Sequence, residues 1–318
     1  MPDETVFWHD IGGTAVKLGI VDETGRVLLK GEESVSFDGY QTPVLTTVRK
    51  AAKEFLTANS IPVESLAGIG VSATGQIDSR KGIVAGTCGN FPNYIGSPIK
   101  SALEEDFGLP VTVANDANCM TLGEVWVGAA QGYTDVIGVT LGTGVGGGII
   151  ANGQLVRGVH FTAGEYSFVN TNADEWENTE KTMACQCSTK YLLKWYRARK
   201  GLPADAPMNG KLFFDAANAA EPEALEVLER FCKMVAVQIY NLTVLLDVEK
   251  VAIGGGISKQ PLLLDDLRRV YAGLFASRGE SPYMIGLPRC EIVPCHFSSE
   301  ANQVGALYTY LQAESKTI

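Results

Sequence analysis

An aspartate between two asparagines could activate a hydroxyl group for phosphorylation. The run Asn115-Asp116-Ala117-Asn118 follows Val111–Ala114, an apolar segment that is predicted to be a strand. Phosphoryl transfer to an alcohol needs a carboxylate that orients the hydroxyl and accepts its proton. Flanking asparagines can bind neighbouring hydroxyls, which suits a polyol. The alternative is that this run caps the N-terminus of a helix, where Asn and Asp are both favoured.

A second run, Asp10-Ile11-Gly12-Gly13-Thr14, stands at the end of another predicted strand. Two glycines and a threonine can present backbone N–H groups and a hydroxyl to phosphate oxygens. The preceding carboxylate can hold Mg²⁺, often through water. The alternative is an ordinary Gly-Gly hairpin turn. If the first interpretation holds, this run binds phosphate and magnesium.

The glycine-rich run Gly142–Gly148 formally contains the G-x-G-x-x-G pattern of dinucleotide-binding proteins. That interpretation requires a helix directly after the glycines. The residues that follow instead predict a hairpin, with a two-residue turn at Asn152-Gly153. A second phosphate-binding loop around Thr143 and Gly144, facing the first loop, explains the glycines better.

A fourth run, Gly254-Gly255-Gly256, follows the predicted buried strand Lys250–Ile253. Three glycines would let a flat ring such as adenine approach the backbone closely. The alternative is a flexible turn between a strand and a helix.

The elements that would position these runs repeat in the two halves of the chain. The order strand, glycine turn, strand, tight turn, strand spans Val6–Val35 and recurs over Val136–Val156, which suggests a duplicated nucleotide-clamping unit. Helical spacing of apolar residues predicts a helix at Glu223–Leu246. Further helices are predicted at Leu45–Ala58, Pro98–Phe107 and Glu300–Leu311, and further strands at Gly68–Ser72 and Val111–Ala114.

The length of 318 residues suits two α/β domains. We expect an N-terminal domain over residues 1–114, completed by a C-terminal helix at 300–312. A second domain would span residues 115–299, with a hinge near residue 115. No low-complexity linker separates them.

Composition disfavours several classes of function. The net charge of −10, without a basic cluster, argues against a nucleic-acid partner. The acidic start of the chain does not resemble a secretory signal, and no stretch reaches the roughly 18 apolar residues of a membrane span. Seven scattered cysteines argue against a disulfide framework, so we expect a cytoplasmic protein.

In the order in which they follow one another along the chain, the four runs resemble the ROK family, a name that covers repressors, open reading frames and sugar kinases. The resemblance spans nearly the whole chain. It implies the actin-like ATPase (ribonuclease H-like) fold of two α/β domains with an interdomain cleft. It also implies ATP and Mg²⁺ as cosubstrates, a small-molecule sugar as acceptor, and commonly a homodimer.

The resemblance also implies roles for individual residues. Asp116 would be the catalytic base and Asp10 would position Mg²⁺ through water. Gly75, Asn115 and Glu165 would line the sugar, because Ala73-Thr74-Gly75 and Gly164-Glu165 match the family's sugar-binding segments. The residues implied in ATP binding are Gly12, Gly13, Thr14, Thr143, Gly144, Gly254, Gly255 and Gly256.

The chain departs from the family pattern beside the sugar. Where the family has Glu-x-Gly-His, the sequence reads Glu165-Tyr166-Ser167-Phe168, so a phenylalanine replaces the histidine. The family's zinc loop is reduced to Cys185 and Cys187, and by register Leu192 stands in the place of its third cysteine and Lys194 in that of its glutamate. Structural zinc needs four ligands. We therefore expect no structural zinc and a differently shaped pocket. The polar segment Asn170–Thr182 replaces the zinc loop and is a candidate cover for the sugar.

The expected function is ATP-dependent phosphorylation of a sugar hydroxyl, the 6-hydroxyl of a hexose or β-glucoside. Zinc-lacking members resemble β-glucoside kinases and some N-acetylmannosamine kinases, and this chain looks closer to the former. The repressor branch is not expected, because Asp10 leaves no room for an N-terminal helix-turn-helix. The alternatives are a sugar-binding sensor without catalysis and an actin-like or chaperone-like ATPase.

Overall fold

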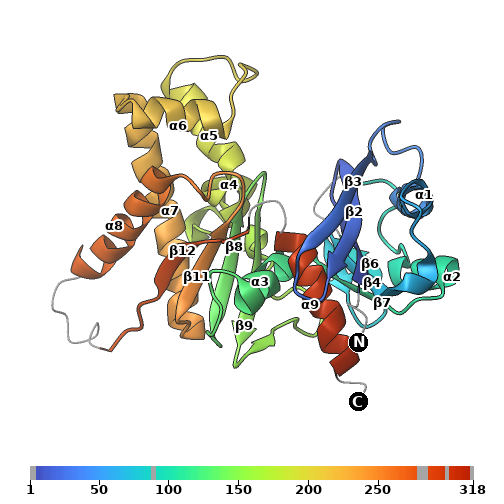
Figure 1. Ribbon diagram of the computed structural model, residues 1–318. Coiled ribbons are helices and arrows are strands. Elements are labelled where there is room, and N and C mark those ends of the chain that lie inside the picture. Colours follow the sequence, from blue (N-terminus) through green and yellow to red (C-terminus); the bar gives the residue numbers. More distant parts are fainter. Residues whose placement is uncertain (1–4, 87–90, 278–285, 298–300, 316–318) are drawn as a thin grey trace. The chain divides into compact units, whose positions relative to one another are not determined.

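The structure is a computed structural model that describes residues 5–86, 91–277, 286–297 and 301–315, and its chain divides into two compact units (Figure 1). Unit 1 consists of Met1–Trp126, Arg157–Ala163 and Ser299–Ile318. Unit 2 consists of Val127–Val156 and Gly164–Ser298. The boundary expected near residue 115 therefore falls inside unit 1, which also contains the C-terminal helix.

Unit 1 is built on a five-stranded sheet in the order β3-β2-β1-β4-β7. The strands β1, β4 and β7 are parallel, whereas β2 and β3 form antiparallel hairpins with their neighbours. The strands are β1 (Thr5–Ile11), β2 (Ala15–Asp22), β3 (Val27–Ser34), β4 (Leu66–Ala73) and β7 (Val111–Asn115), with a separate hairpin of β5 (Gln76–Asp78) and β6 (Ile83–Gly86).

Helices cover both faces of this sheet. They are α1 (Val44–Ala58), α2 (Ile99–Phe107), α3 (Asp116–Val127) and α9 (Ala301–Ser315). The α9 helix lies against the sheet, where Leu307 and Tyr310 pack with Trp8. A Cβ added at Gly70 on β4 would lie 2.6 Å from the carbonyl oxygen of Ala306, so a glycine is needed for this close approach. Glu300, the first residue of the helix predicted here, lies outside the described residues.

Unit 2 contains a second five-stranded sheet, in the order β10-β9-β8-β11-β12. Its strands are β8 (Val136–Leu141), β9 (Val145–Ala151), β10 (Gln154–Leu155), β11 (Lys250–Gly254) and β12 (Glu291–Pro294). Its helices are α4 (Met183–Cys187), α5 (Thr189–Arg199), α6 (Gly210–Asn218), α7 (Pro222–Leu246) and α8 (Pro261–Ser277).

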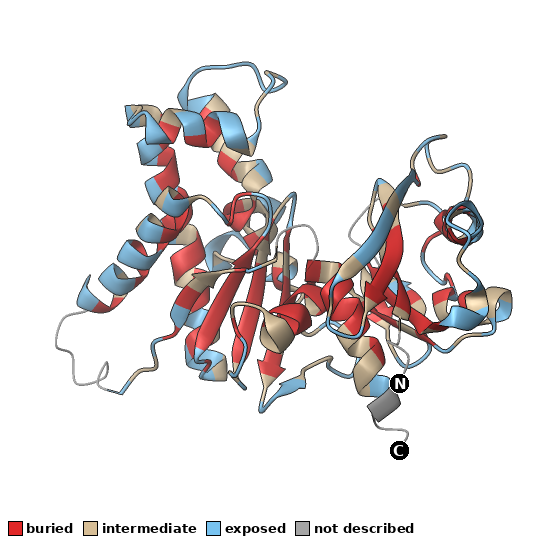
Figure 2. Ribbon diagram, viewed as in Figure 1, coloured by how far each residue is buried: buried red, intermediate tan, exposed pale blue. Residues whose placement is uncertain are grey.

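The two sheets share one topology. In each, two antiparallel pairings are followed by two parallel ones, so the predicted repeat of the same unit agrees with the observed strand order. The central strands are buried in both sheets (Figure 2). No helix within the described ranges has the length and apolar character needed to cross a lipid bilayer.

Candidate active site

The parallel strands of unit 1 bring several predicted site residues to one edge of the sheet. Asp10 on β1 pairs in register with Ser72 on β4, and Ala73 pairs with Asn115 on β7. Because parallel strands end on the same side, the residues that follow them are neighbours. This edge carries four of the predicted residues: Asp10, Gly75, Asn115 and Asp116.

Asp10 is held by two side-chain hydrogen bonds. Ser72 Oγ donates to Asp10 Oδ1 over 3.0 Å, and Asn302 Nδ2 donates to the same oxygen over 3.1 Å. Among the described residues, Oδ2 receives no hydrogen bond, which leaves it to bind a cation or water. Burial raises the pKa of Asp10, and the two hydrogen bonds and the charge of Lys17 offset only part of this increase.

Lys17 is a charged neighbour of Asp10 that the sequence analysis does not identify. It lies on β2, directly opposite Asp10 in the β1–β2 register, and it is half-buried. The hairpin pattern itself contains the signal, because pairing across the Gly12-Gly13 turn places these two residues opposite each other.

The first glycine loop is the turn of the β1–β2 hairpin. The Gly12 N–H donates to the carbonyl oxygen of Ala15 over 3.0 Å, and Tyr40 Oη donates to the Gly13 carbonyl oxygen over 2.5 Å. Within the described part of the chain, the N–H groups of Gly13 and Thr14 donate to no protein acceptor. The hairpin alternative is therefore correct as a description of the backbone, and it leaves two N–H groups for an anion.

Asn115 and Asp116 stand at the start of α3. Asn115 Oδ1 accepts from the N–H of Asn118 over 3.1 Å, so Asn115 does cap the helix. Its Nδ2 donates to the Gly75 carbonyl oxygen over 2.9 Å, which ties α3 to the loop after β4. Asp116 Oδ1 accepts from the N–H of Ala117 over 2.8 Å. The cap and the proposed chemistry are compatible, because the cap fixes the backbone that carries the carboxylate.

Tyr94 lies close to both carboxylates and is also absent from the sequence prediction. Its side chain is only 2% exposed, and its hydroxyl donates to the Thr74 carbonyl oxygen over 3.3 Å. Burial, and then the negative charges of Asp116 and Asp10, raise the pKa of Tyr94. One phenol therefore experiences the charges of both acids, so Asp10 and Asp116 lie in the same part of unit 1.

In unit 2 the equivalent edge carries glycines. Gly254 on β11 pairs in parallel with Thr140 on β8, so the Gly142–Gly144 turn and the Gly254–Gly256 run lie at the same end of the sheet. Gly255 has a φ of +99°, and a Cβ there would lie 2.4 Å from the Leu141 carbonyl oxygen. Only glycine fits this position. A Cβ on Gly256, by contrast, would meet no atom within 4 Å.

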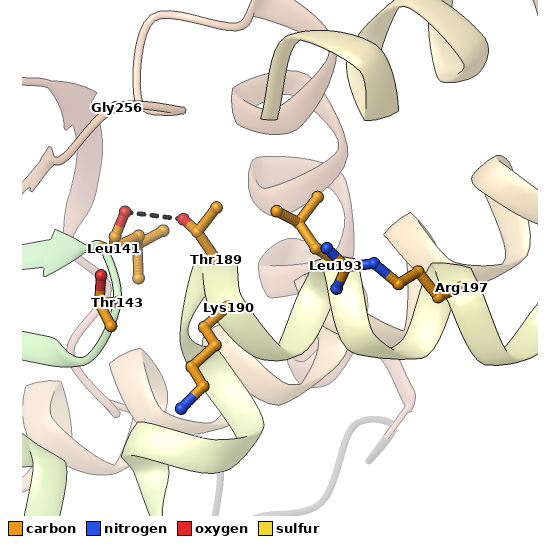
Figure 3. Close-up of a pocket in the computed structure, with 8 residues that line it drawn as sticks. Leu141, Thr143, Thr189, Lys190, Leu193, Arg197 and Gly256 are labelled. Carbon is orange, nitrogen blue, oxygen red and sulfur yellow. Dashed lines mark hydrogen bonds between the residues drawn. The ribbon is translucent and has the colours of Figure 1, made fainter. Parts of the chain in front are cut away.

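A cavity of about 380 Å³ opens beside these glycines, within the size range of small-molecule sites (Figure 3). It is lined by Leu141, Gly142, Thr143, Thr189, Lys190, Leu193, Arg197 and Gly256. Thr189 Oγ1 donates to the Leu141 carbonyl oxygen over 2.9 Å and so fixes the start of α5 beside the loop. The cavity thus adds two cations, Lys190 and Arg197, that the sequence analysis does not identify.

Glu165 is carried by a segment that packs on β9. Tyr166 is 3% exposed, and a Cβ added at Gly147 would lie 2.0 Å from its ring. Gly147 is therefore needed for packing, which explains one glycine of the run without a ligand. Glu165 itself is half-buried, and burial raises its pKa.

The remnant of the zinc loop shows no metal site in the described ranges, where no three His, Cys, Asp or Glu side chains group closely enough to bind one. Leu192, at the third cysteine's position, is fully buried in the core of unit 2. Lys194, at the glutamate's position, pairs with Glu180. The segment from Asn170 to Thr182 is closed by a backbone bridge between its two ends.

Comparison with known proteins gives consistent matches. The sequence model of the ROK family matches residues 9–313. A β-glucoside kinase of Listeria innocua is 32% identical over 96% of this chain and 97% of its own length. Among solved structures, a candidate N-acetylmannosamine kinase from Listeria monocytogenes has a TM-score of 0.82 and 29% identity, covering 98% of this chain and 99% of that one. A ROK family glucokinase from Streptomyces griseus, in complex with glucose and AMPPNP, has a TM-score of 0.77 and 26% identity, covering 96% and 98%.

Proposed function

The chain belongs to the ROK family, and we propose that it phosphorylates the 6-hydroxyl of a β-glucoside, with Asp116 as the general base. It is an ATP-dependent carbohydrate kinase of the actin-like ATPase fold. The observation that carries the assignment of residues is the shared edge of unit 1, where Asp10, Asp116 and the loop at Gly75 lie together.

On the acceptor side, Asp116 accepts the proton of the attacking hydroxyl as its oxygen bonds to the γ-phosphorus. Its place in the first turn of α3, behind the Asn115 cap, holds the carboxylate still. Gly75, Asn115 and Glu165 bind the other sugar hydroxyls. Burial raises the pKa of Glu165, so its charged form is poorly solvated in the free protein. Hydrogen bonds from sugar hydroxyls would stabilise that carboxylate.

On the donor side, Asp10 holds Mg²⁺ through water, since its Oδ2, which accepts from no donor among the described residues, suits a hard cation. The ion would neutralise charge on the phosphates. The loops at Gly12–Thr14 and Thr143-Gly144 receive phosphate oxygens with backbone N–H groups. The adenosine lies in the cavity beside Gly254–Gly256.

The preference for a β-glucoside rests on the named relative and on the altered end of the sugar motif. Phe168, which replaces the histidine, is 60% exposed and offers an apolar surface where the family pattern has a polar one. N-acetylmannosamine is the runner-up acceptor, since a structural neighbour is a candidate kinase for that sugar.

We also propose a cytoplasmic homodimer, with one domain over residues 1–114 that is completed by the helix at 300–312, and a second domain over residues 115–299. The dimer rests on the family resemblance, and the domain limits rest on the chain length and on the order of elements that repeats in its two halves. The cytoplasmic location is supported by the described cysteines Cys119, Cys185, Cys187, Cys232 and Cys290, which form no disulfide with one another.

The test is ADP release from ATP and Mg²⁺ with a panel of acceptors: cellobiose, aryl β-glucosides, glucose, N-acetylmannosamine, N-acetylglucosamine, mannose and fructose. We expect turnover with cellobiose or an aryl β-glucoside, at a kcat/KM at least about tenfold above that for N-acetylmannosamine. Turnover with N-acetylmannosamine alone would replace the proposed acceptor. No turnover with any acceptor, from protein that binds ATP, would favour the sensor.

A further inference from the structure

One hydroxyl in unit 2 joins the predicted sugar-binding segment to the second phosphate loop. Ser167 Oγ donates to the Val145 carbonyl oxygen over 2.8 Å and accepts from the Val145 N–H over 3.2 Å. Val145 is the first residue of β9 and directly follows the Gly142–Gly144 turn. A single side chain therefore satisfies both backbone groups of the residue that ends the loop.

Among the described residues, no strand supplies these hydrogen bonds on that side of β9. In the described chain, β10 pairs with β9 only at Ile150 and Ala151, far from the loop. Tyr166 Oη donates to the carbonyl oxygen of Gly148, which is closer to the loop along β9, over 3.4 Å. The segment that carries Tyr166 and Ser167 thus takes the place of an edge strand.

The same segment is held in place between Glu165 and Ser167 by a backbone hydrogen bond and a buried ring. It forms a short 3₁₀ helix, Tyr166–Phe168, in which the Phe168 N–H donates to the Glu165 carbonyl oxygen over 3.2 Å. The buried Tyr166 ring anchors its middle. A ligand that restrains the Glu165 side chain will therefore also restrain the position of Ser167, two residues away.

We propose that Ser167 is a positioning residue through which sugar bound at Glu165 orders the phosphate loop Gly142–Gly144. This inference rests on the proposed function, which places the sugar at Glu165 and the nucleotide phosphates at the loop. Sugar hydroxyls that bind the Glu165 carboxylate fix the 3₁₀ helix, and the Ser167 hydroxyl then fixes Val145. The loop binds nucleotide more tightly, and by linkage the nucleotide tightens sugar binding by the same factor.

The test measures this coupling factor by calorimetry. The Kd of Mg²⁺–AMPPNP is measured with and without saturating cellobiose, or glucose if the wild type phosphorylates only glucose. We expect sugar to tighten nucleotide binding in the wild type. Ser167→Ala should lower the coupling factor by about three- to tenfold, because two backbone hydrogen bonds are lost. Ser167→Thr, which keeps the hydroxyl, should restore most of it.

Thr189→Ala is the matched control. It removes another hydroxyl that bonds beside this loop, at the Leu141 carbonyl oxygen, but within the described chain Thr189 forms no hydrogen bond with the segment Glu165–Phe168. It should weaken AMPPNP binding by the same factor with and without sugar. Circular dichroism and thermal melting confirm that each variant is folded.

The outcomes separate the two proposals. If the wild type neither binds AMPPNP nor phosphorylates any sugar, the proposed function fails, and this inference with it. If the wild type is an active kinase whose ligands bind independently, the coupling role alone is wrong. It is also wrong if Ser167→Ala keeps the wild-type coupling factor, or if Thr189→Ala lowers that factor as much.

Discussion

The two sheets have the same strand order and directions, yet the edges at which their parallel strands end differ in chemistry. In unit 1 the edge carries side chains, with Asp10, Asn115 and Asp116 fixed by hydrogen bonds. In unit 2 the matching edge carries the glycine runs Gly142–Gly144 and Gly254–Gly256. One edge offers carboxylates, whereas the other offers bare backbone.

This difference suggests a division of work between two copies of one scaffold. Carboxylates can move protons and bind a cation, so substitutions at the edge of unit 1 should lower kcat or raise the Mg²⁺ concentration that the reaction needs. Glycine backbone can approach a flat ring or phosphate, so substitutions at the edge of unit 2 should raise the KM for ATP. A substitution at one edge that produced the effect expected of the other edge would contradict this division of roles.

The largest effect is expected from Asp116→Ala. Without a base to accept the hydroxyl proton, kcat should fall by about 10²- to 10⁴-fold. Binding of AMPPNP should change less than about twofold, because Asp116 belongs to the acceptor side. Steady-state kinetics and calorimetry on one preparation measure both quantities. A variant with the wild-type kcat would show that Asp116 is not the base.

Asp10→Asn should give the next largest effect. The amide keeps the shape of the side chain but lacks the charge that attracts Mg²⁺, so the Mg²⁺ concentration for half-maximal activity should rise about tenfold or more. Asp22→Asn is the matched control. Asp22 is the last residue of β2, at the end of the hairpin away from the Gly12-Gly13 turn, and its substitution should leave that concentration unchanged. Equal Mg²⁺ titrations for the three proteins would contradict the assignment of Asp10.

Gly255→Ala probes the opposite edge. The φ of +99° and the 2.4 Å approach of a Cβ to the Leu141 carbonyl oxygen should cost about 1–3 kcal/mol of strain. We expect the KM for ATP to rise and the KM for sugar to stay constant. Gly256→Ala, whose Cβ would meet nothing within 4 Å, should leave the free energy of unfolding unchanged. A larger rise in the KM for sugar than in the KM for ATP would show that this edge of unit 2 does not serve ATP binding alone.

A pH effect on stability is expected from His9 in unit 1. This side chain is fully buried, and burial lowers its pKa to about 3. The unfolded chain binds this proton near pH 6.5 and the folded chain only near pH 3. The neutral, buried His9 therefore contributes fully to the free energy of unfolding above pH 6.5, and this contribution is lost as the pH falls from 6.5 towards 3.

From this histidine, the free energy of unfolding should be about 1.4 kcal/mol lower at pH 5.5 than at pH 7.5. Urea denaturation of the wild type and His9→Phe at both pH values isolates this term, since other acid-sensitive groups are common to both proteins. An identical pH slope in the two would show that His9 is not responsible.

The smallest effect concerns the cysteines of the former zinc loop. Treatment with a zinc chelator should change the melting temperature by less than about 1 °C, whereas loss of a structural zinc lowers stability strongly. Cys185→Ser should behave like the wild type under the same treatment. A marked loss of stability with the chelator would reveal a zinc site.

The amphipathic and hairpin elements could be predicted from the sequence. The helix predicted at Glu223–Leu246 is α7, Pro222–Leu246, because one apolar face repeats at helical spacing. The prediction does not include α3, whose buried residues run consecutively from Cys119 to Glu124 and give no helical period. It also lacks α5, where Leu192 and Tyr196 are the only buried residues.

The candidate site could be predicted only where chemistry and glycine turns coincide. Asp10 and Asp116 stand beside glycines or asparagines that mark them in the sequence. Tyr94 and Arg197 carry no such mark, because tertiary packing alone brings them to the site. Ser167 was visible as a departure from the family pattern, but its bond to Val145 depends on the fold of β9.

The most direct test of the account is ³¹P NMR of the product that the wild-type protein forms from ATP, Mg²⁺ and cellobiose or an aryl β-glucoside. We predict a phosphomonoester resonance coupled to the two protons of a 6-carbon, appearing in step with ADP. Inorganic phosphate as the sole product beside ADP would show an ATPase and contradict the proposed role of Asp116.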